Sequence, residues 1–397
     1  MIPSDSALAG RQPLEIADII GRYADAYIKN HRLPVKHLKV LHHIRYCRTA
    51  MMGGHQQQCN ACGFKRNAYN SCGDRHCPKC RTLSKERWLE ARKAELLPTG
   101  YFHLVFTLPH DLNPIIHCNP GTLLDCLFSS VNETLQAFAA DTRWRLVGQL
   151  GFIGVLHTWS QTLMDHFHLH CLVPAGVLSF NKTRWVASRK KYLFRAKSLA
   201  KQFRKTYIGH LEQLYGNGEL DFYGNTTPES FPGLITTLKA KKWIVYAKAP
   251  FAGPEQVLGY LGRYTHRVAI SNHRVMSIDD EQVTFTYKDR SDENRSRQMT
   301  LSADEFIRRF LLHVLPPRFV KIRYFGFLFH RDKHRNIALI RAQMGDQAVM
   351  AASVVEDTQQ IMLRLTGIDI HCCPHCGRGQ MRVMYKIPRG SRIREPP

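Results

Sequence analysis

Acidic residues are scarce in this sequence of 397 residues. Asp and Glu total 32 against 56 Lys and Arg, which leaves a formal net charge of +24. Such an excess favours polyanionic partners, because cations that bind phosphates release the condensed counterions of a nucleic acid. A basic but solvated surface, or binding to a membrane surface, is the alternative. Together with the cysteine spacing described below, the charge predicts that the partner is a nucleic acid.

Long apolar segments are missing as well. No run of about 18 apolar residues occurs, and Met1–Pro13 lack the apolar stretch of a signal peptide. We therefore expect a cytoplasmic protein without membrane attachment. Internal repeats and long low-complexity stretches are also absent, while 44% hydrophobic and 10% aromatic residues are ordinary values for a globular protein. At this length the chain is expected to form two or three domains.

The apolar spacing predicts mixed α and β structure. Residues 14–46 have the periodicity of helices, and a charged helix is expected from Ser84 to about Leu97. Three strands and one helix are expected further along, over residues 102–108, 152–159, 168–177 and 123–138 respectively. This order favours an α+β fold with antiparallel strands and covering helices.

A basic segment follows these elements. Residues 181–207 contain ten Lys or Arg and no Asp or Glu, with Trp185, Tyr192 and Phe203 among them. A solvated helix face is the usual explanation for such a run, but the absence of any acid gives nucleic-acid contact equal weight. Aromatic rings between the cations can stack on unpaired bases. Lys190 and Lys191 are candidate DNA contacts, and the basic stretch within residues 300–350 is assigned DNA contact too.

Two Cys-x-x-Cys pairs predict a zinc site in the N-terminal quarter. The pairs are separated by 14 residues, and their members are Cys59, Cys62, Cys77 and Cys80. Four thiolates can surround one zinc ion tetrahedrally, and such an ion folds a segment that cannot form a core of its own. Buried free cysteines are the alternative. Further candidate ligands, which could replace one of the four or support a second ion, are His55, Cys72 and His76.

A third pair, Cys373 and Cys376, lies near the C-terminal end. One Cys-x-x-Cys pair supplies half of a zinc site. It could bind zinc together with His371 or His375, combine with a distant ligand, or bind nothing. We favour metal binding.

The chemical centre is expected at three alternating histidines. His166, His168 and His170 lie on an expected strand, so their side chains project from the same face. Adjacent imidazoles suit a divalent ion with open coordination positions. One histidine on an apolar strand is usually just packed, but three on one face are harder to bury without partners.

A pair of tyrosines forms the second element of this centre. Tyr260 and Tyr264 are four residues apart and would share one face of a helix. Tyrosines at that spacing more often belong to a core. Here, however, the neighbouring residues suit a close approach to phosphate rather than a packed helix, and they are Gly259, Gly262, Arg263, His266 and Arg267. The three basic ones are candidate phosphate contacts.

The histidine–apolar–histidine strand and the Tyr-x-x-x-Tyr helix together resemble the HUH endonucleases of the two-tyrosine class. More specifically, the chain resembles rolling-circle transposases of the insertion-sequence-91 type. The matching stretches follow one another along nearly the whole chain, at residues 70–72, 75–80, 106–109, 155–159, 166–173, 260–270 and 323–328.

The resemblance implies a fold and a domain order. The fold is α+β, with a ferredoxin-like HUH nuclease sheet that carries the histidines on a central strand. Residues 1–98 would form a helical and zinc-binding domain. Residues 99–285 would form the nuclease domain, with a basic insertion at about 181–240, and residues 286–397 a basic helical C-terminal region with the third cysteine pair.

The resemblance also implies a mechanism. His168 and His170 would bind Mg²⁺ or Mn²⁺, with Gln161 or His166 as the third ligand, while Zn²⁺ would be structural. One tyrosine would attack single-stranded DNA at the end of a mobile element, leaving a 5′-phosphotyrosine linkage and a free 3′-OH. The setting implied is the nucleoid of a bacterial cytoplasm.

Other functions explain less of the sequence. A plasmid replication initiator or relaxase shares the chemistry but is not expected to carry both cysteine modules. A non-catalytic zinc-dependent nucleic-acid-binding protein accounts for the cysteines and the charge, yet leaves the histidine strand and the tyrosine pair as coincidences. A decayed copy would fold without working, but none of the motifs is visibly broken.

Overall fold

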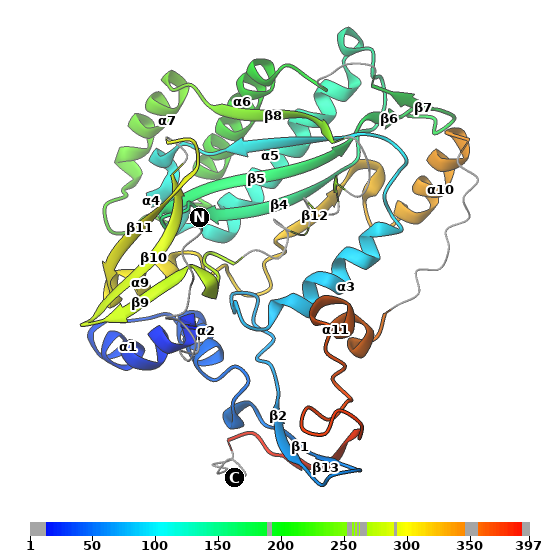
Figure 1. Cartoon of the computed structure of the whole chain (residues 1–397). Helices are drawn as coiled ribbons and strands as arrows, with labels where there is room; N and C mark the ends of the chain where they lie inside the picture. The colour runs from blue at the N-terminus through cyan, green and yellow to red at the C-terminus, as the bar shows by residue number, and fades with distance from the viewer. Residues whose placement is uncertain are drawn as a thin grey trace, which may run out of the picture.

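An antiparallel five-stranded sheet forms the centre of the computed structural model (Figure 1). The structure describes residues 13–188, 193–251, 256, 257, 259, 262, 268–289, 292–345 and 356–390. The strand order of the central sheet is β12-β4-β5-β3-β8. Its strands are β3 (Tyr101–Thr107), β4 (Phe152–Trp159), β5 (Asp165–Pro174), β8 (Ile244–Phe251) and β12 (Ile322–Phe325). Because β5 is the middle strand, its backbone groups are paired on both sides, and its side chains are held rigidly.

One face of the central sheet is covered by helices. These are α4 (Asn113–Cys118), α5 (Pro120–Ala140), α6 (Ala196–Gly216) and α7 (Phe231–Ala240). Apolar residues at alternate positions of the strands, such as Phe102 and Leu104 on β3 and Leu169 and Cys171 on β5, pack under them in the largest core. This alternation is what the apolar strand patterns predict, and the expected α+β class is confirmed.

The opposite face is covered in part. Ile153 and Val155 of β4 pack there with Tyr324, Ile337 and Ile340 in a smaller core. The helices on this side are α3 (Arg81–Lys93) and α10 (Lys333–Gln343). The uncovered part of this face carries the polar side chains of the site described below.

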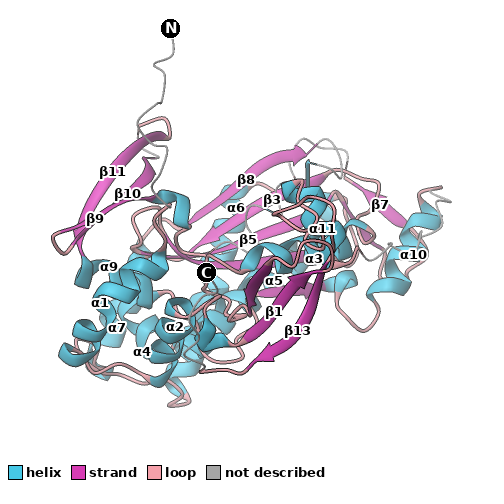
Figure 2. Ribbon diagram, turned by 60° about the horizontal axis from the view of Figure 1, so that its bottom comes forward, coloured by secondary structure: helices cyan, strands magenta, loops and turns pink. Residues whose placement is uncertain are grey.

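A second core joins the N-terminal helices to a three-stranded meander (Figure 2). Its elements are α1 (Ile16–Asn30), α2 (Val35–Arg45), β9 (Val275–Asp279), β10 (Gln282–Asp289), β11 (Arg295–Ser302) and α9 (Ala303–Leu312). Ile16, Ile19 and Ile20 of α1 are almost fully buried there, as the helical spacing of residues 14–46 predicts. The two segments that share this core lie far apart in the sequence.

A small ribbon pairs an early segment of the chain with the C-terminal one (Figure 1). Its strand order is β13-β1-β2, from β1 (Gly54–Cys59), β2 (Lys65–Tyr69) and β13 (Met381–Ile387), with α11 (Thr358–Thr366) preceding β13. The remaining elements are β6 (Gly176–Leu178), β7 (Trp185–Ala187), η1 (Ala50–Met52), η2 (His110–Leu112), η3 (Thr142–Trp144), η4 (Pro228–Ser230), η5 (Asn272–Arg274) and η6 (Gly326–Leu328).

The C-terminal third of the chain shares sheets with both earlier regions. β12 pairs with β4 of the central sheet, and β13 pairs with β1 of the ribbon. Residues 286–397 were expected to be helical, and they contribute the strands β11, β12 and β13 as well. Among the described residues, no helix is long and apolar enough to cross a membrane.

Candidate metal centre and cysteine clusters

The three histidines of β5 lie on the partly uncovered face of the central sheet. Strand alternation carries Phe167 and Leu169 into the core under α5 and α6. The same alternation turns His166, His168 and His170 to the other side. The structure thus places the three imidazoles on one face, as the sequence pattern predicts.

A fourth histidine reaches the same point from the neighbouring strand. His157 of β4 is the register partner of His168. Its ring centroid lies 5.3 Å from that of His168 and 4.5 Å from that of His170, while those two are 4.9 Å apart. All three residues are buried, and one nitrogen of each lies within 4.8 Å of the others. Together they offer a divalent ion three nitrogen ligands and leave further coordination positions open.

The orientation of His168 is fixed by its own strand. Its Nδ1 donates a hydrogen bond to the carbonyl of His166 at 2.6 Å. A carbonyl can only accept, so Nδ1 carries the proton and the lone pair of the ring is on Nε2. Metal-binding histidines are commonly held in this way, with one nitrogen bonded to the protein and the other directed at the ion.

His170 is held by another buried histidine. His103 of β3 lies with its Nε2 2.9 Å from Nδ1 of His170, and the two rings are stacked. Burial, together with the nearby charge of Lys248, lowers the pKa of His103 to about 4. A neutral His103 can accept a hydrogen bond from Nδ1–H of His170 at its Nε2. Nε2 of His170 is then left for a metal.

The two residues expected from sequence as the third ligand lie nearby. Gln161 and His166 line the same cavity of about 280 Å³ as the three buried histidines. The ring of His166 is 4.7 Å from that of His168, but its nitrogens do not join the close group formed by His157, His168 and His170. Sequence reasoning missed His157, because its position opposite His168 depends on the register between the two strands.

The meander closes the other side of this cavity. Tyr287, Lys288 and Asp289 at the end of β10 line it opposite the histidines. Trp159 also lines the cavity, and the Nζ of Lys321 lies 5.1 Å from the centre of its ring. The site therefore combines buried imidazoles with aromatic rings and one lysine, while the carboxylate of Asp289 is paired with Arg297.

Several residues singled out in the sequence lie outside the described residues. They are the tyrosines Tyr260 and Tyr264 and the basic residues Arg263, His266, Arg267, Lys190 and Lys191. Two sequence neighbours of Tyr260, Val257 and Gly262, are among the described residues. Val257 is fully buried against Tyr101 and Leu172, and a Cβ at Gly262 would lie 3.1 Å from Leu89 of α3. Leu172 is two residues beyond His170, so Val257 packs on the face of the sheet that carries the histidines.

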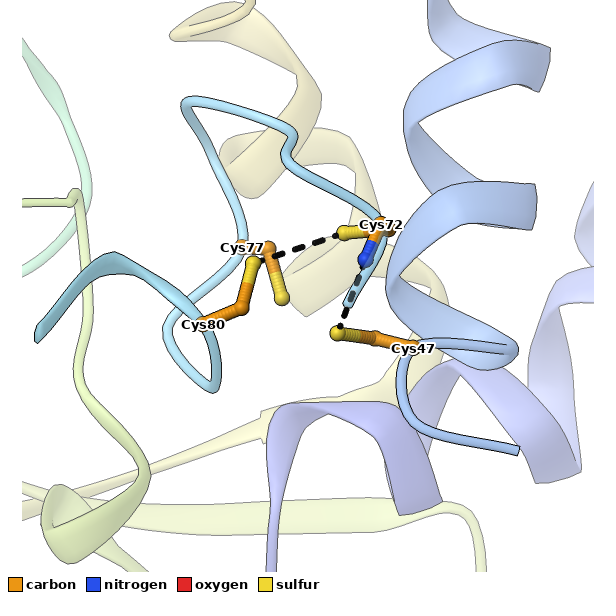
Figure 3. Close-up of side chains that lie close together, drawn as sticks. All are labelled: Cys47, Cys72, Cys77 and Cys80. Atoms are coloured by element: carbon orange, nitrogen blue, oxygen red, sulfur yellow. Dashed lines mark hydrogen bonds between the residues drawn. The ribbon is translucent and has the colours of Figure 1, made fainter. Parts of the chain in front are cut away.

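A four-cysteine cluster lies between α2 and α3 (Figure 3). It consists of Cys47, Cys72, Cys77 and Cys80, whose sulfur atoms lie within 4.8 Å of one another. The amide of Cys72 donates to Sγ of Cys47 at 3.5 Å, and the Sγ atoms of Cys72 and Cys80 are 3.7 Å apart. Hydrogen bonds from the Cys72 and Cys77 thiols lower the pKa of Cys47 to about 7, towards the thiolate form that binds metals.

His76, expected as an alternative zinc ligand, has a different role. Its Nδ1 lies 3.0 Å from a carboxylate oxygen of Asp74, and its Nε2 accepts from the amide of Leu315. Burial raises the pKa of Asp74, but hydrogen bonds from His76 and His43 outweigh this effect and hold the pKa well below its usual range. Both ring nitrogens of His76 are therefore engaged in fixing the loop around the cluster.

The expected grouping of the two N-terminal cysteine pairs is corrected by the structure. Cys59 and Cys62 do not lie with Cys77 and Cys80 but with Cys373 and Cys376, which form a second four-cysteine cluster. The physical reason is strand pairing, because β1 ends at Cys59 beside β13 rather than beside the loop that leads to α3. Cys72 joins the first cluster, and His55 lies on β1 beside Gln57.

Comparison with known proteins identifies the family of the chain. A family model described as "Putative transposase" matches residues 151–335, and another described as "Transposase zinc-binding domain" matches residues 19–108. The chain is 45% identical over 375 residues to "Putative transposase y4qJ" of Sinorhizobium fredii, which covers 92% of this chain and 94% of the relative. The chain belongs to the insertion-sequence-91 type of transposases.

A second relative of this transposase is more distant. The transposase for insertion sequence element IS801 of Pseudomonas savastanoi pv. phaseolicola is 28% identical over 301 residues, which cover 72% of this chain and 68% of the relative. No solved structure matches the chain significantly. The zinc-binding model covers the whole first cysteine cluster but only half of the second, since Cys373 and Cys376 lie beyond both matched ranges. The matched domain and the clusters support structural Zn²⁺.

Transposases act on DNA, and this one has a strongly basic cavity on its helical layer. The cavity has a volume of about 1030 Å³ and is bordered by Arg195, Lys201, Arg204 and Lys205 of the α6 region. The acidic residues at its border are already paired, Asp141 with Arg143 and Glu212 with Lys239. Lys201 and Lys205 of α6 therefore remain available for phosphates, while Arg204 donates hydrogen bonds to the carbonyls of Lys239 and Lys241.

The aromatic residues of this basic segment do not serve as expected. Phe203 is fully buried, with its ring 5.2 Å from those of Phe106 and Trp243. Trp185 packs against Phe327. Neither ring is free to stack on bases, because each fills an apolar contact; Tyr192 lies outside the described residues.

Proposed function

We propose that this transposase cuts and rejoins single-stranded DNA at the ends of its mobile element through a 5′-phosphotyrosine intermediate. His157, His168 and His170 would hold the divalent ion, and Tyr260 and Tyr264 would be the nucleophiles. The observation that carries the proposal is the close group of three buried imidazoles on the middle strand and its neighbour. A DNA-binding protein without catalysis would leave this group unexplained.

The donor set fits a divalent transition metal. Nε2 of His168 is left for the ion by the bond of Nδ1 to the carbonyl of His166. Three imidazoles favour Mn²⁺ over Mg²⁺, because Mg²⁺ prefers oxygen ligands and binds nitrogen weakly. A bound divalent ion polarises the scissile phosphate and stabilises the charge that develops on it. Gln161 and His166 remain candidates for a further contact from the wall of the cavity.

The proposed reaction exchanges one phosphodiester bond for another. A tyrosine gives its phenolic proton to solvent, and its oxygen attacks the phosphorus. As the new phosphorus–oxygen bond forms, the bond to the 3′ oxygen breaks, and this oxygen takes up a proton to become a free 3′-OH. Attack by a 3′-OH on the phosphotyrosine reverses the step and rejoins DNA. The bond energy is conserved throughout, so no ATP is needed, and a second tyrosine permits two successive cleavages.

The neighbours of Tyr260 support its assignment. Val257 packs against Leu172, on the same face of the sheet as His170, and Gly262 lies against α3. Val257 and Gly262 bracket Tyr260 in sequence, and both lie on the side of the sheet that carries the histidines. Arg263, His266 and Arg267 are proposed as phosphate contacts beside it.

We propose further that the central sheet is the HUH nuclease domain, with a ferredoxin-like arrangement. In support, β5 is the middle of five antiparallel strands, and helices cover the face opposite the histidines. The proposed domains are residues 1–98 for zinc binding, 99–285 for the nuclease and 286–397 for the C-terminal region. The basic border of α6, together with Lys190 and Lys191, is the proposed path of the DNA backbone.

A denaturing-gel assay tests the proposed reaction. Single-stranded oligonucleotides from the element's ends, labelled at the 5′ or the 3′ end, are incubated with the protein and Mn²⁺, Mg²⁺ or no added divalent ion. The protein variants are Tyr260→Phe, Tyr264→Phe, the double variant and His157→Ala. Tyr385→Phe is a matched control, because Tyr385 is an exposed tyrosine of the distant ribbon.

The expected product is a metal-dependent covalent adduct between the protein and the 5′ phosphate of the downstream fragment. It should form with the wild type and Tyr385→Phe, and disappear in the double tyrosine variant. Tight DNA binding without any adduct, under every metal tried, would show that the chain is a zinc-dependent DNA-binding protein instead. Adduct formation by the double variant would move the nucleophile to another residue.

A further inference from the structure

The second cysteine cluster consists of two knuckles with the same local geometry. They are Cys59–Gly63 and Cys373–Gly377. In each knuckle the amide of the final glycine donates to the carbonyl of the first cysteine, at 3.2 and 3.0 Å respectively. Both glycines have a positive φ, +76° for Gly63 and +65° for Gly377, which other residues rarely adopt. Two segments more than 300 residues apart have thus folded into the same turn.

The sulfur atoms of the knuckles face one another across a short gap. The Sγ atoms of Cys59 and Cys376 are 3.8 Å apart, and those of Cys62 and Cys373 are 3.7 Å apart. A tetrahedral zinc ion with bonds of about 2.3 Å to sulfur places its ligand atoms about 3.8 Å from each other. The observed separations therefore match a zinc site, and they are far longer than the sulfur–sulfur bond of a disulfide, about 2.05 Å.

Backbone amides support the sulfur atoms in both knuckles. The amide of Ala61 donates to Sγ of Cys59, and that of Gly379 donates to Sγ of Cys376, each at 3.3 Å. Amide donors favour the thiolate, which is the form that binds a metal.

The two knuckles are also fastened to each other. The amide of Asn60 donates to the carbonyl of Gln380 at 3.1 Å, and the amide of Gln380 donates back to Oδ1 of Asn60 at 2.8 Å. The rings of Phe64 and His375 are stacked, with centroids 5.4 Å apart. These contacts place the knuckles in one relative position without the aid of a large core.

Gly379 shows how closely the ribbon encloses the sulfur atoms. A Cβ at this position would lie 2.2 Å from Sγ of Cys59 and 2.8 Å from Cβ of Ala61. No side chain larger than a hydrogen fits there. The position is built around the sulfur cluster, and any substitution would force Cys59 out of place.

The ribbon has too little apolar surface to fold alone. Its core cluster contains Cys59, Cys373 and Met381, with Phe64 and Cys376 packed against them. Very small units of this kind usually need a metal or a disulfide to be stable. The cysteines themselves make up more than half of this core, so the ribbon depends on what they bind.

We propose that Cys59, Cys62, Cys373 and Cys376 form a second structural zinc site, which fastens the C-terminal segment to the N-terminal ribbon. The transposase then carries two tetrathiolate zinc ions, one in each cysteine cluster. The site is independent of the proposed nuclease chemistry, because its ligands lie in a different sheet from the histidines.

Metal stoichiometry tests the proposal directly. The full-length chain is purified in a His168→Ala background, so that the histidine site adds no ion to the count, and is analysed for zinc. The metal-free reduced chain is then titrated with Co²⁺ while the thiolate charge-transfer absorbance is followed. The variants are Cys376→Ser and Gly379→Ala. Cys372→Ser is the matched control, because Cys372 is adjacent to Cys373 but outside both clusters. Limited proteolysis followed by mass spectrometry reports release of residues 356–390.

The His168→Ala parent and Cys372→Ser should hold two zinc ions per chain and reach their Co²⁺ endpoint at two equivalents. Cys376→Ser and Gly379→Ala should hold one, with cleavage in residues 356–390 at least tenfold faster. An endpoint of the parent at one equivalent, or full retention of both ions by the variants, would overturn the proposal. So would disulfides between the two knuckles in protein that was purified under reducing conditions.

Discussion

His157 and His168 are register partners on adjacent antiparallel strands, and their ring centroids lie 5.3 Å apart. This relationship brings a third imidazole to the two that the sequence pattern identifies on β5. Because both strands lie inside the sheet, backbone pairing on each side fixes the positions from which the two rings project. Rigid ligand placement of this kind favours an ion that accepts a fixed set of nitrogen donors.

Substitution of His157 should therefore affect metal binding before anything else. We expect His157→Ala to weaken Mn²⁺ binding by at least tenfold and to reduce Mn²⁺-dependent DNA cleavage by a hundredfold or more. Isothermal titration calorimetry of Mn²⁺, together with cleavage rates over a range of Mn²⁺ concentrations, measures both. His334→Ala is the control, because His334 is exposed on α10 and does not line the cavity. Equal loss of Mn²⁺ affinity in both variants would contradict the assignment.

His103 is expected to act through His170 rather than on DNA. Its Nε2 lies 2.9 Å from Nδ1 of His170, and the residue is buried. Replacement by Leu should lower the Mn²⁺ affinity about 10–100-fold, the usual cost of losing the partner that orients a metal-binding histidine. His103→Gln, whose amide oxygen can still accept a hydrogen bond from Nδ1 of His170, should restore part of this affinity. A purely structural role predicts the opposite, with stability reduced and the Mn²⁺ dependence of cleavage unchanged.

The sequence predicts the parts of the site that depend on local periodicity. Alternation along a single strand is enough to place His166, His168 and His170 on one face, and the apolar pattern of residues 152–159 coincides with β4. His157 needed one further step, the register between two strands. The register of a hairpin with a short link can be estimated from the sequence to within about one residue. A shift of one residue would turn His157 to the other face of the sheet.

Pairing between distant segments could not be predicted. Cys77 and Cys80 are closest in sequence to Cys59 and Cys62, yet the latter lie with Cys373 and Cys376. The pairing of β1 with β13 in the folded chain decides this grouping. The local sequence around each cysteine pair does not indicate which other pair it will join. The same holds for Phe203, whose cationic neighbours suggested an exposed base-stacking ring, although its apolar face is needed in the core under α6.

The basic border of α6 should contribute to binding and not to chemistry. Lys201 and Lys205 are exposed and one helical turn apart, on the helical layer that covers the face opposite the histidines. We expect the double Ala variant to bind single-stranded DNA more weakly. The slope of the logarithm of the binding constant against the logarithm of the salt concentration should become shallower by about 1.4, which is about 0.7 for each lost phosphate contact.

Fluorescence anisotropy at several salt concentrations measures this slope. The cleavage rate at saturating oligonucleotide should be unchanged, because neither lysine lies near the histidines. Lys288 provides a contrasting variant, since it lines the histidine cavity. An unchanged salt slope in the double variant would show that the DNA backbone does not follow α6.

Stability should decrease below neutral pH, in part because of His313. Burial lowers the pKa of His313 to about 4, although its bond to the carbonyl of Leu163 and the charge of Asp165 act in the opposite direction. The charges of His117 and His76 lower the pKa further. In the unfolded chain the group has its ordinary pKa of 6.5. Between these two values the unfolded state binds a proton that the folded state does not, so the folded state loses stability as the pH falls.

The expected loss from this group is about 1.4 kcal/mol for each pH unit at most, and it vanishes above the unfolded pKa. Urea unfolding of the wild type and His313→Gln from pH 7.5 to pH 5.5 measures it. The variant should be less stable at pH 7.5, since a buried hydrogen bond to Leu163 is lost, but its stability should depend less on pH. His334→Gln, at an exposed position of α10, should retain the pH dependence of the wild type. If His313→Gln retains it as well, protonation of His313 does not limit stability in this range.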